Sequence, residues 1–173
     1  PRIALESEGD LNKFWELFNE RMNIAEDALV YRVERTKEAT PANAPILYQY
    51  GAFGRRLGKE ESVDELFKNR RATVSLGYIG LYEVATVFFD NNWETNPEAK
   101  EFTLDIIRDM KHRVEEWSDQ YGYHFSIYST PSESLTDRFC RLDTEKFGSI
   151  PDITDKEYYT NSFHYDVRKN PTP

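Results

Sequence analysis

Two long stretches of helical periodicity constrain the fold more than any other feature of this sequence. In the first, Asp10 is the expected N-cap, and the helix is predicted to end near Glu38. In the second, Asn96-Pro97-Glu98 combines an N-cap, a proline at the first helical position and an acid in the first turn, and Gly122 is the expected C-cap. Apolar side chains recur at spacings of three and four in both, so one face of each helix is expected to be buried. The residues are Leu11, Phe14, Phe18, Met22, Ala25 and Leu29 in the first helix, and Phe102, Ile106, Met110, Val114, Trp117 and Tyr121 in the second.

Short apolar segments around these helices predict strands. The candidates are the first five residues, which resemble the end of a strand, and the segments Ala72–Leu76, Tyr123–Tyr128 and Asn161–Tyr165. Strands that alternate with long helices indicate an α/β protein with at least partly parallel strands. The chain has 173 residues, which suffices for one domain with a sizeable core. We therefore expect residues 1–173 to form a single domain, with long helices outside a partial arc of a larger sheet or barrel.

The segment from Tyr121 to Arg141 holds the strongest candidate for a binding site. A helix start follows the strand at once: Thr130 is the expected N-cap, Pro131 the first helical residue, and Glu133 completes a capping box. The hydroxyl groups of Ser129, Ser132 and Ser134 surround the same turn. Backbone N–H groups at a helix start lack intrahelical acceptors, and the helix dipole adds partial positive charge there. The turn is therefore a candidate anion or phosphate site.

An ordinary capped helix after a strand explains the same residues without any ligand. A serine- and threonine-rich turn is what a capped helix start needs in any case. The carboxylate of Glu133 opposes an incoming phosphate unless it turns back into the capping box. Both interpretations stay open from the local sequence.

A second segment with the order strand, turn and helix runs from Arg71 to Phe89. Its turn, Gly77-Tyr78-Ile79-Gly80, has the outline of a loop that cradles phosphate, but its spacing matches neither of the common glycine-rich motifs. Glycines that supply a positive φ or close packing in a tight turn explain it equally well.

The region between the first long helix and this strand is rich in proline and glycine and predicts a loop. Within it, Ile46-Leu47-Tyr48 is expected to form a short buried segment. Arg55-Arg56 is either an anion contact or, by default, a surface pair. Ser62 and Glu65 form another capping box, which predicts a short helix to about Asn69.

The last part of the chain has a less regular pattern. A turn is expected at Pro151-Asp152, and Asp155 is the expected cap of a short helix through Tyr159. The three histidines, His112, His124 and His164, show no metal-ligand spacing, so no metal site is predicted. His164, between two aromatic residues, is the best candidate for a pocket histidine, whereas His112 is expected at the surface and His124 in packing or hydrogen bonding.

Charge and cysteine content exclude several classes of protein. The chain has 31 acidic and 22 basic residues, a formal net charge of −9, which argues against a nucleic-acid partner. A single cysteine, Cys140, excludes a disulfide within the chain and favours a reducing, cytoplasmic setting. We expect Cys140 to be a buried, inert thiol. No stretch is long and apolar enough to span a membrane, so no membrane association is expected.

Taken together, five runs resemble the anaerobic (class III) ribonucleoside-triphosphate reductases, a family of glycyl radical enzymes. The runs are PRIALE, SLGYIGLYE, DIIRDMKHRVEEW, YGYHFSIYSTPSESLTDRF and FGSIPDITDKEYYTNSFHYDV, and together they cover nearly the whole chain. The resemblance implies a ten-stranded α/β barrel of two five-stranded halves. It also implies reduction of ribonucleoside triphosphates to deoxyribonucleotides, the precursors for DNA replication, through a transient cysteine thiyl radical.

The same resemblance implies cofactors, partners and a site. A stored glycyl radical generates the thiyl after activation by a radical-SAM activating enzyme with an iron–sulfur cluster, formate is the reductant, zinc is bound near the C-terminus, and the full-length protein is a homodimer. Sibling reductases bind substrate phosphates at a strand-to-helix turn. By that similarity, the substrate phosphate-binding residues here are Ser129, Thr130, Ser132, Glu133 and Ser134.

The sequence also departs from the family pattern. The loop that carries the thiyl cysteine, the glycyl radical motif, the four-cysteine zinc site and the regulatory nucleotide domain have no counterpart in these residues. Cys140 matches no catalytic cysteine, and Gly77 is not assigned as the radical glycine. We therefore expect a central fragment of the catalytic barrel, inactive alone, with neither catalytic residues nor a cofactor of its own. The alternatives are a non-catalytic phosphate- or nucleotide-binding module and a purely structural domain.

Overall fold

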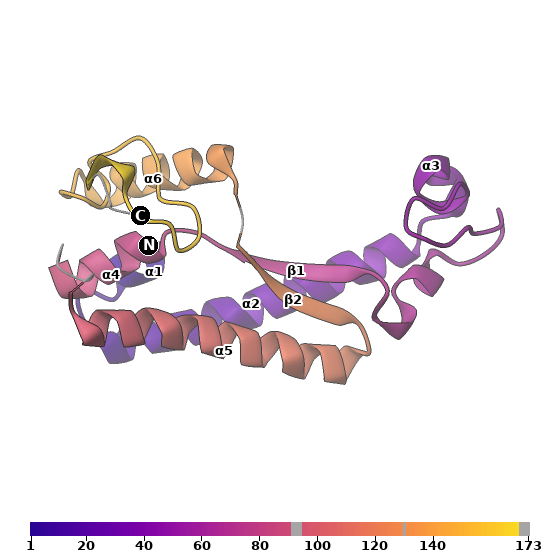
Figure 1. Cartoon of the computed structure of the whole chain (residues 1–173), viewed down its shortest axis with the longest axis horizontal. Helices are drawn as coiled ribbons and strands as arrows, with labels where there is room; N and C mark the ends of the chain where they lie inside the picture. The colour runs from indigo at the N-terminus through magenta and orange to yellow at the C-terminus, as the bar shows by residue number, and fades with distance from the viewer. Residues whose placement is uncertain (91–94, 130, 170–173) are drawn as a thin grey trace. The chain divides into compact units, whose positions relative to one another are not determined.

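The structure is a computed structural model that describes residues 1–90, 95–129 and 131–169 (Figure 1). Contacts group the chain into two compact units. The first unit comprises Pro1–Arg21, Gly77–Met110 and Tyr128–Pro173, and the second comprises Met22–Leu76 and Lys111–Ile127. Within the described residues, no helix combines the length and the apolar character that crossing a bilayer requires.

The two long predicted helices are confirmed as α2 (Leu11–Lys37) and α5 (Pro97–Tyr121) (Figure 1). The Asp10 carboxylate accepts hydrogen bonds from the amides of Asn12 and Lys13 at 2.8 and 3.1 Å, so it is the N-cap of α2. The side-chain oxygen of Asn96 accepts from the Glu98 amide at 2.9 Å and caps α5. Gly122, with φ +71°, ends α5 by donating its amide to the Ser118 carbonyl at 3.1 Å.

Burial follows the predicted stripes in α5 more closely than in α2. Five of the six stripe residues of α5 are buried, namely Phe102, Ile106, Met110, Val114 and Trp117. In α2, Phe14, Phe18 and Met22 are buried, whereas Leu11 is 41% exposed at the first turn. Val33, which the sequence analysis did not include, is also buried.

Two of the four predicted strands are confirmed, and they form a parallel pair. β1 (Thr73–Tyr78) and β2 (His124–Ser129) are neighbours in a two-stranded sheet. Thr73 Oγ1 lies 3.2 Å from His124 Nδ1 at the strand starts, and the Tyr78 hydroxyl lies 2.8 Å from Ser129 Oγ at the strand ends. The start of β1 therefore lies beside the start of β2, so the two strands are parallel, in agreement with the predicted α/β class.

The other two predicted strands are wrong. The first residues form the short helix α1 (Arg2–Glu6), in which Ala4 is fully buried. A short, mostly apolar run of five residues fits either a strand or one helical turn, and packing decided between them. Asn161–Tyr165 is irregular, with a single antiparallel bridge between Ile79 and Asn161. The helix predicted from Asp155 to Tyr159 is also wrong, since none of these residues is helical.

The core of the first unit is aromatic. α4 (Leu81–Phe89) follows β1, and the ring of Phe88 lies 5.5 Å from that of Phe14 and 5.3 Å from that of Phe102. α6 (Glu133–Phe147) contributes Cys140 to a second cluster with Ile153 and Tyr159. A 3₁₀ helix, η5 (Val167–Lys169), lies at the end of the described chain.

The second unit contains short helical segments around a small core. They are the 3₁₀ helices η1 (Pro41–Asn43), η2 (Val63–Leu66) and η3 (Lys68–Arg70) and the α-helix α3 (Pro45–Tyr48). Ser62 caps η2 as predicted, by accepting from the Asp64 amide at 3.2 Å, but the predicted single helix is two 3₁₀ turns. Leu57, Val63 and Leu66 are buried together.

The predicted burial of Ile46-Leu47-Tyr48 is wrong in the second unit. Ile46 is 73% exposed and Leu47 is 40% exposed, whereas Tyr48 is partly buried against the Leu57 cluster. A tight helical turn of four residues presents its side chains in several directions, so only one of the three reaches the core.

Gly80 and Gly122 allow a matched test of the turn before α4. Both have positive φ, +77° and +71°, but a Cβ on Gly80 would lie 2.4 Å from Pro1 Cγ, whereas a Cβ on Gly122 would meet no atom within 4 Å. Left-handed backbone costs an alanine about 1–2 kcal/mol, and overpacking adds about 1–3 kcal/mol. We expect Gly80→Ala to lower the free energy of unfolding clearly more than Gly122→Ala in urea denaturation. Equal losses would contradict the close packing at Gly80.

Candidate functional site

The predicted anion-binding turn lies between β2 and α6, but its helix starts later than expected. α6 begins at Glu133 with Ser132 as N-cap, and Ser132 makes no side-chain cap hydrogen bond. The predicted capping box pairs Glu133 with Thr130, which lies outside the described residues, and Glu133 is the first residue of α6 instead of the third. A tertiary contact explains the shift, because the Ser132 amide donates to the Asn161 side-chain oxygen at 3.0 Å.

The first three backbone amides of α6 have no hydrogen-bond acceptor within the described residues. Among residues 1–90, 95–129 and 131–169, no atom accepts a hydrogen bond from the backbone amides of Glu133, Ser134 or Leu135. All three residues are exposed. The first bond of α6 is donated by the Thr136 amide to the Ser132 carbonyl at 3.1 Å. The start of α6 can thus donate to an anion or to water, as orphan amides at a helix start do.

The second candidate turn, Gly77–Gly80, is closed by protein. The amides of Gly80 and Leu81, at the start of α4, donate to the carbonyls of Thr160 and Ser162 at 3.0 and 2.9 Å. These carbonyls occupy the place that a bound anion would take. The structure therefore favours the packing explanation of Gly77–Gly80 over a phosphate loop.

A buried ion network lies behind the segment that closes α4. Lys156 Nζ is 2.5 Å from the Glu83 carboxylate and 3.2 Å from the Asp166 carboxylate. The side chains of Lys156, Glu83 and Asp166 are 5%, 0% and 3% exposed. Glu83 also accepts from the amide and the hydroxyl of Thr160 at 2.9 and 2.8 Å. The buried charges are paired and hydrogen-bonded, which is the condition for keeping them ionised in a core.

Arg168 extends this network toward the surface. Burial opposes ionisation of Asp166, but hydrogen bonds from Arg168 and from Lys156 outweigh it and lower the pKa of Asp166 to about 2. Arg168 also lies 3.6 Å from Asp152 and 3.5 Å from Asp155. Its hydrogen bonds with Asp166 raise the pKa of the guanidinium further, so it stays charged.

A second polar cluster ties the same segment to α6. The Tyr159 hydroxyl donates to Asp143 at 2.7 Å, and the Tyr159 amide donates to the Thr136 carbonyl at 3.2 Å. Arg2 pairs with the other Asp143 oxygen at 2.5 Å. Burial and the bond to Asp143 raise the pKa of Tyr159 well above its usual value, so the phenol stays protonated as a donor.

Cys140 and the histidines have structural positions. Cys140 is fully buried and donates to the Lys156 carbonyl at 3.1 Å, and burial raises the pKa of its thiol to about 11. The predicted burial of this thiol is confirmed, and its raised pKa disfavours the reactive thiolate at neutral pH. His112 is a surface residue near Glu116, as predicted, whereas His164 is exposed, so its assignment to a pocket is wrong. In the described part of the chain, no three His, Cys, Asp or Glu residues come together as a metal site.

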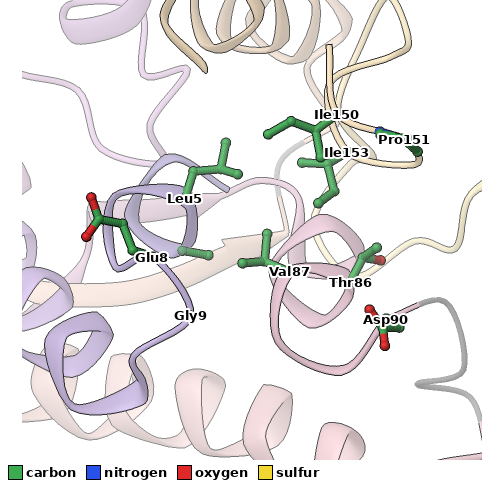
Figure 2. Close-up of a pocket in the computed structure, with 10 residues that line it drawn as sticks. Leu5, Glu8, Gly9, Thr86, Val87, Asp90, Ile150, Pro151 and Ile153 are labelled. Atoms are coloured by element: carbon green, nitrogen blue, oxygen red, sulfur yellow. The ribbon is translucent and has the colours of Figure 1, made fainter. Parts of the chain in front are cut away.

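The first unit also contains a cavity of about 430 Å³ (Figure 2). Figure 2 shows its lining residues coming from α1 and the turn after it, from α4, and from the segment after α6. None of them belongs to the turn at residues 129–134. The residues are Ala4, Leu5, Glu8, Gly9, Thr86, Val87, Asp90, Ile150, Pro151 and Ile153.

Sequence reasoning missed the residues that hold the turn in place. Glu83 is the only charged residue in the apolar helix LYEVATVFF, and an isolated acid in such a helix is a recognisable sign of a buried pair. The sequence around its partner Lys156 gave no comparable indication of a buried pair, since Lys156 lies in a polar segment. Asn161, which binds the Ser132 amide, was included only in a predicted strand.

Comparison with known proteins identifies what this chain is similar to. The family model described as anaerobic ribonucleoside-triphosphate reductase matches residues 1–173. The chain is 48% identical over 174 residues to the anaerobic ribonucleoside-triphosphate reductase of Salmonella typhimurium, and 46% identical over 177 residues to that of Enterobacteria phage T4. All of this chain is covered in both comparisons. It spans 24% and 28% of those proteins' lengths.

Solved structures with the same fold are anaerobic ribonucleotide reductases. A structure of the Thermotoga maritima enzyme with MES in the active site superposes with a TM-score of 0.71 and 24% identity, over 93% of this chain and 25% of that one. The complex of the same enzyme with dATP and CTP gives a TM-score of 0.66 and 22% identity, over 92% and 24%. These likenesses show the fold, and they agree with the predicted partial arc of an α/β barrel.

The buried network should dominate the stability of the first unit. Lys156→Met removes the cation between two buried carboxylates, and breaking a buried pair in this way costs about 3–5 kcal/mol. Lys146→Met removes the half-exposed partner of Glu6, and surface pairs contribute about 0–1 kcal/mol. We expect chemical denaturation to show a much larger loss for Lys156→Met. Similar losses in the two variants would show that the buried network contributes little.

Asp166 should make stability depend on pH in the acid range. Its pKa is lowered from an ordinary 3.8 to about 2 in the folded protein, so the unfolded chain takes up this proton first as pH falls. The stabilisation from Asp166 is complete above the ordinary value and is lost as pH falls from about 4 toward 2. Asp166→Asn should therefore show a shallower loss of unfolding free energy over that range than the wild type. Parallel pH profiles would contradict the lowered pKa.

Proposed function

Because the chain belongs to the anaerobic ribonucleoside-triphosphate reductase family, we propose that it forms part of an oxidoreductase that reduces ribonucleoside triphosphates to deoxyribonucleotides. The family match over residues 1–173, with relatives at 48% identity, carries this proposal. The chain spans about a quarter of the Salmonella relative, so the activity is that of a larger protein. Residues 1–173 contribute one domain-sized piece of its catalytic barrel.

The radical chemistry is assigned to other parts of that enzyme. Cys140 does not fit a thiyl cysteine, because it is buried, donates to a backbone carbonyl and has a raised pKa. Gly77 lies within β1 and does not fit a radical glycine at an accessible loop. We assign the glycyl radical, the formate reductant and zinc to the full-length protein. We also propose that the full-length protein is a cytoplasmic homodimer and that it contacts a radical-SAM activating enzyme.

The turn at residues 129–134 is proposed as a substrate phosphate-binding site. The amides of the exposed residues Glu133, Ser134 and Leu135, which have no acceptor among the described residues and lie at the positive end of the α6 dipole, support this role. The hydroxyls of Ser129, Thr130, Ser132 and Ser134 are the side-chain donors proposed beside them. CTP, a ribonucleoside triphosphate, is bound in one Thermotoga maritima structure, and a triphosphate of that class is the ligand proposed for this turn.

The buried network has a positioning role in this proposal. Thr160 is bonded to Glu83, and the next residue, Asn161, accepts the Ser132 amide. Lys156 pairs with the same Glu83. The ion pair therefore holds Thr160 in place, and the adjacent Asn161 in turn positions Ser132, the N-cap of α6. The pair acts on the turn without touching substrate.

Two alternatives give the turn a different role. A non-catalytic nucleotide-binding module would use the same amides without a reaction, and a purely structural domain would leave them to water. The first predicts nucleotide binding by residues 1–173 in the absence of the rest of the enzyme. The second predicts that charge changes at the turn leave nucleotide affinity unchanged.

A charge change at Ser134 separates binding from stability. An acid in the first turn of α6 stabilises the helix by about 0.3–1 kcal/mol, yet it repels a triphosphate held by the same amides. We expect Ser134→Asp in the full-length enzyme to weaken substrate binding by about tenfold without loss of thermal stability, since a close like charge costs about 1.4 kcal/mol at a partly exposed site. Calorimetric titration with ribonucleoside triphosphates measures the affinity.

Two further variants at the turn serve as controls. Ser134→Asn introduces a side chain of the same size as Asp but without its charge, so the affinity for triphosphate should stay close to that of the wild type. Glu133→Gln removes a carboxylate that opposes the phosphates, so affinity should rise. If all three variants bind triphosphate like the wild type, the phosphate role of this turn is excluded, while the family assignment is unaffected.

A further inference from the structure

One segment is the longest stretch of this acidic chain without an acidic residue. Residues 39–59 include neither Asp nor Glu, although the chain has 31 acidic residues, and Glu38 and Glu60 flank the segment on either side. We call residues 39–59 the acid-free segment. It carries three cations, Arg55, Arg56 and Lys59, and three aromatic residues, Tyr48, Tyr50 and Phe53. Its local charge is thus opposite to that of the chain as a whole.

The acid-free segment exposes large apolar side chains. Ile46 and Tyr50 are 73% and 71% exposed, and Phe53 and Leu47 are 49% and 40% exposed. Single exposed apolar residues are normal, but four within eight residues mark an interaction surface. Tyr, Phe and Arg are also the residue types enriched in protein–protein interfaces.

The surface is held in one conformation by its own hydrogen bonds and core. The amides of Tyr50, Gly54 and Leu57 donate to the carbonyls of Pro45, Gly51 and Tyr48 at 3.0, 2.9 and 2.8 Å. The rings of Tyr48 and Phe53 stack with centroids 6.1 Å apart, and Tyr48 also packs against the Leu57 cluster. A surface that is already ordered loses little entropy on binding.

Two cations on this surface are available to a partner. Arg55 is engaged by Glu61 and Glu65 at 3.1 and 3.0 Å. Arg56 and Lys59 are exposed, and neither has an ion-pair partner among residues 1–90, 95–129 and 131–169. The stem of Arg56 packs over Gly51, where an added Cβ would lie 3.0 Å from Arg56 Cγ. The aliphatic part of the Arg56 side chain is therefore held by packing, and its guanidinium extends from a part of the chain close to Tyr50 and Phe53 in sequence.

We propose that the acid-free segment is a docking surface for a separate protein that presents an acidic face containing aromatic side chains. Charge complementarity selects acidic groups for Arg56 and Lys59, and the exposed rings of Tyr50 and Phe53 select aromatic groups. Nucleic acid is the poorer occupant, because two free cations in a chain of net charge −9 cannot neutralise a phosphate backbone. The proposal does not depend on the reaction or on the phosphate turn.

A random copolymer of glutamate and tyrosine serves as the probe, with polyglutamate and an oligothymidylate as comparison ligands. Fluorescence anisotropy measures their binding to the full-length enzyme that contains this chain. We expect the copolymer to bind more tightly than polyglutamate or the oligothymidylate, and added salt to weaken it. Tyr50→Ala and Arg56→Glu should each weaken binding by at least about fivefold, as changes at central interface residues do.

Matched controls use an aromatic residue and a cation outside the segment. Tyr31 is 65% exposed and Arg71 is exposed, so Tyr31→Ala and Arg71→Glu make the same chemical changes elsewhere. Both should bind the copolymer like the wild type, and circular dichroism identifies any variant that is unfolded. The proposal is overturned if test and control variants lose equal affinity, or if the oligothymidylate binds best through Arg56. Failure of the folded wild-type enzyme to bind the copolymer also overturns it.

Discussion

The ion pair between Glu83 and Lys156 is the interaction on which the first unit depends. Both groups are almost fully removed from water, and a carboxylate or ammonium group in that position is strongly destabilising unless it is matched. Here Glu83 is matched by Lys156 and Thr160, and Lys156 is matched again by Asp166. The arrangement joins α4 to the irregular segment after α6, which has no regular backbone ladder to hold it.

The network explains why the two helix starts that follow β1 and β2 differ in the hydrogen bonds of their amides. The amides at the start of α4 are taken by carbonyls of the segment that Glu83 holds in place, so that helix start is filled by protein. At α6 the same segment reaches the N-cap amide through Asn161, and within the part of the chain that the structure describes no atom accepts from the next three amides. A helix start becomes an anion site only where the surrounding chain leaves its amides free. Neither local sequence contains that information.

In the second unit a small core orders the chain, while neighbouring apolar side chains stay exposed. Leu57, Val63 and Leu66 form a small core that fixes the chain around them, and that core frees neighbouring apolar residues to face outward. Ile46 and Tyr50 would be unremarkable core candidates in a linear sequence. Their exposure beside Arg56 and Lys59 is what makes a proline- and glycine-rich loop a candidate interaction surface.

The sequence by itself determined the long helices α2 and α5, their caps, the two strands and the family. Those features rest on local chemistry: Asp10 and Asn96 cap adjacent amides, apolar stripes repeat with the helical period, and Gly122 ends a helix with a positive φ. Only the tertiary structure decided that Arg2–Glu6 is helical, that α6 starts after Ser132, and that Glu83 meets Lys156. Each of these outcomes depends on a partner far away in the chain. Residues 73 positions apart become neighbours only when the fold excludes water between them, and no local pattern encodes that proximity.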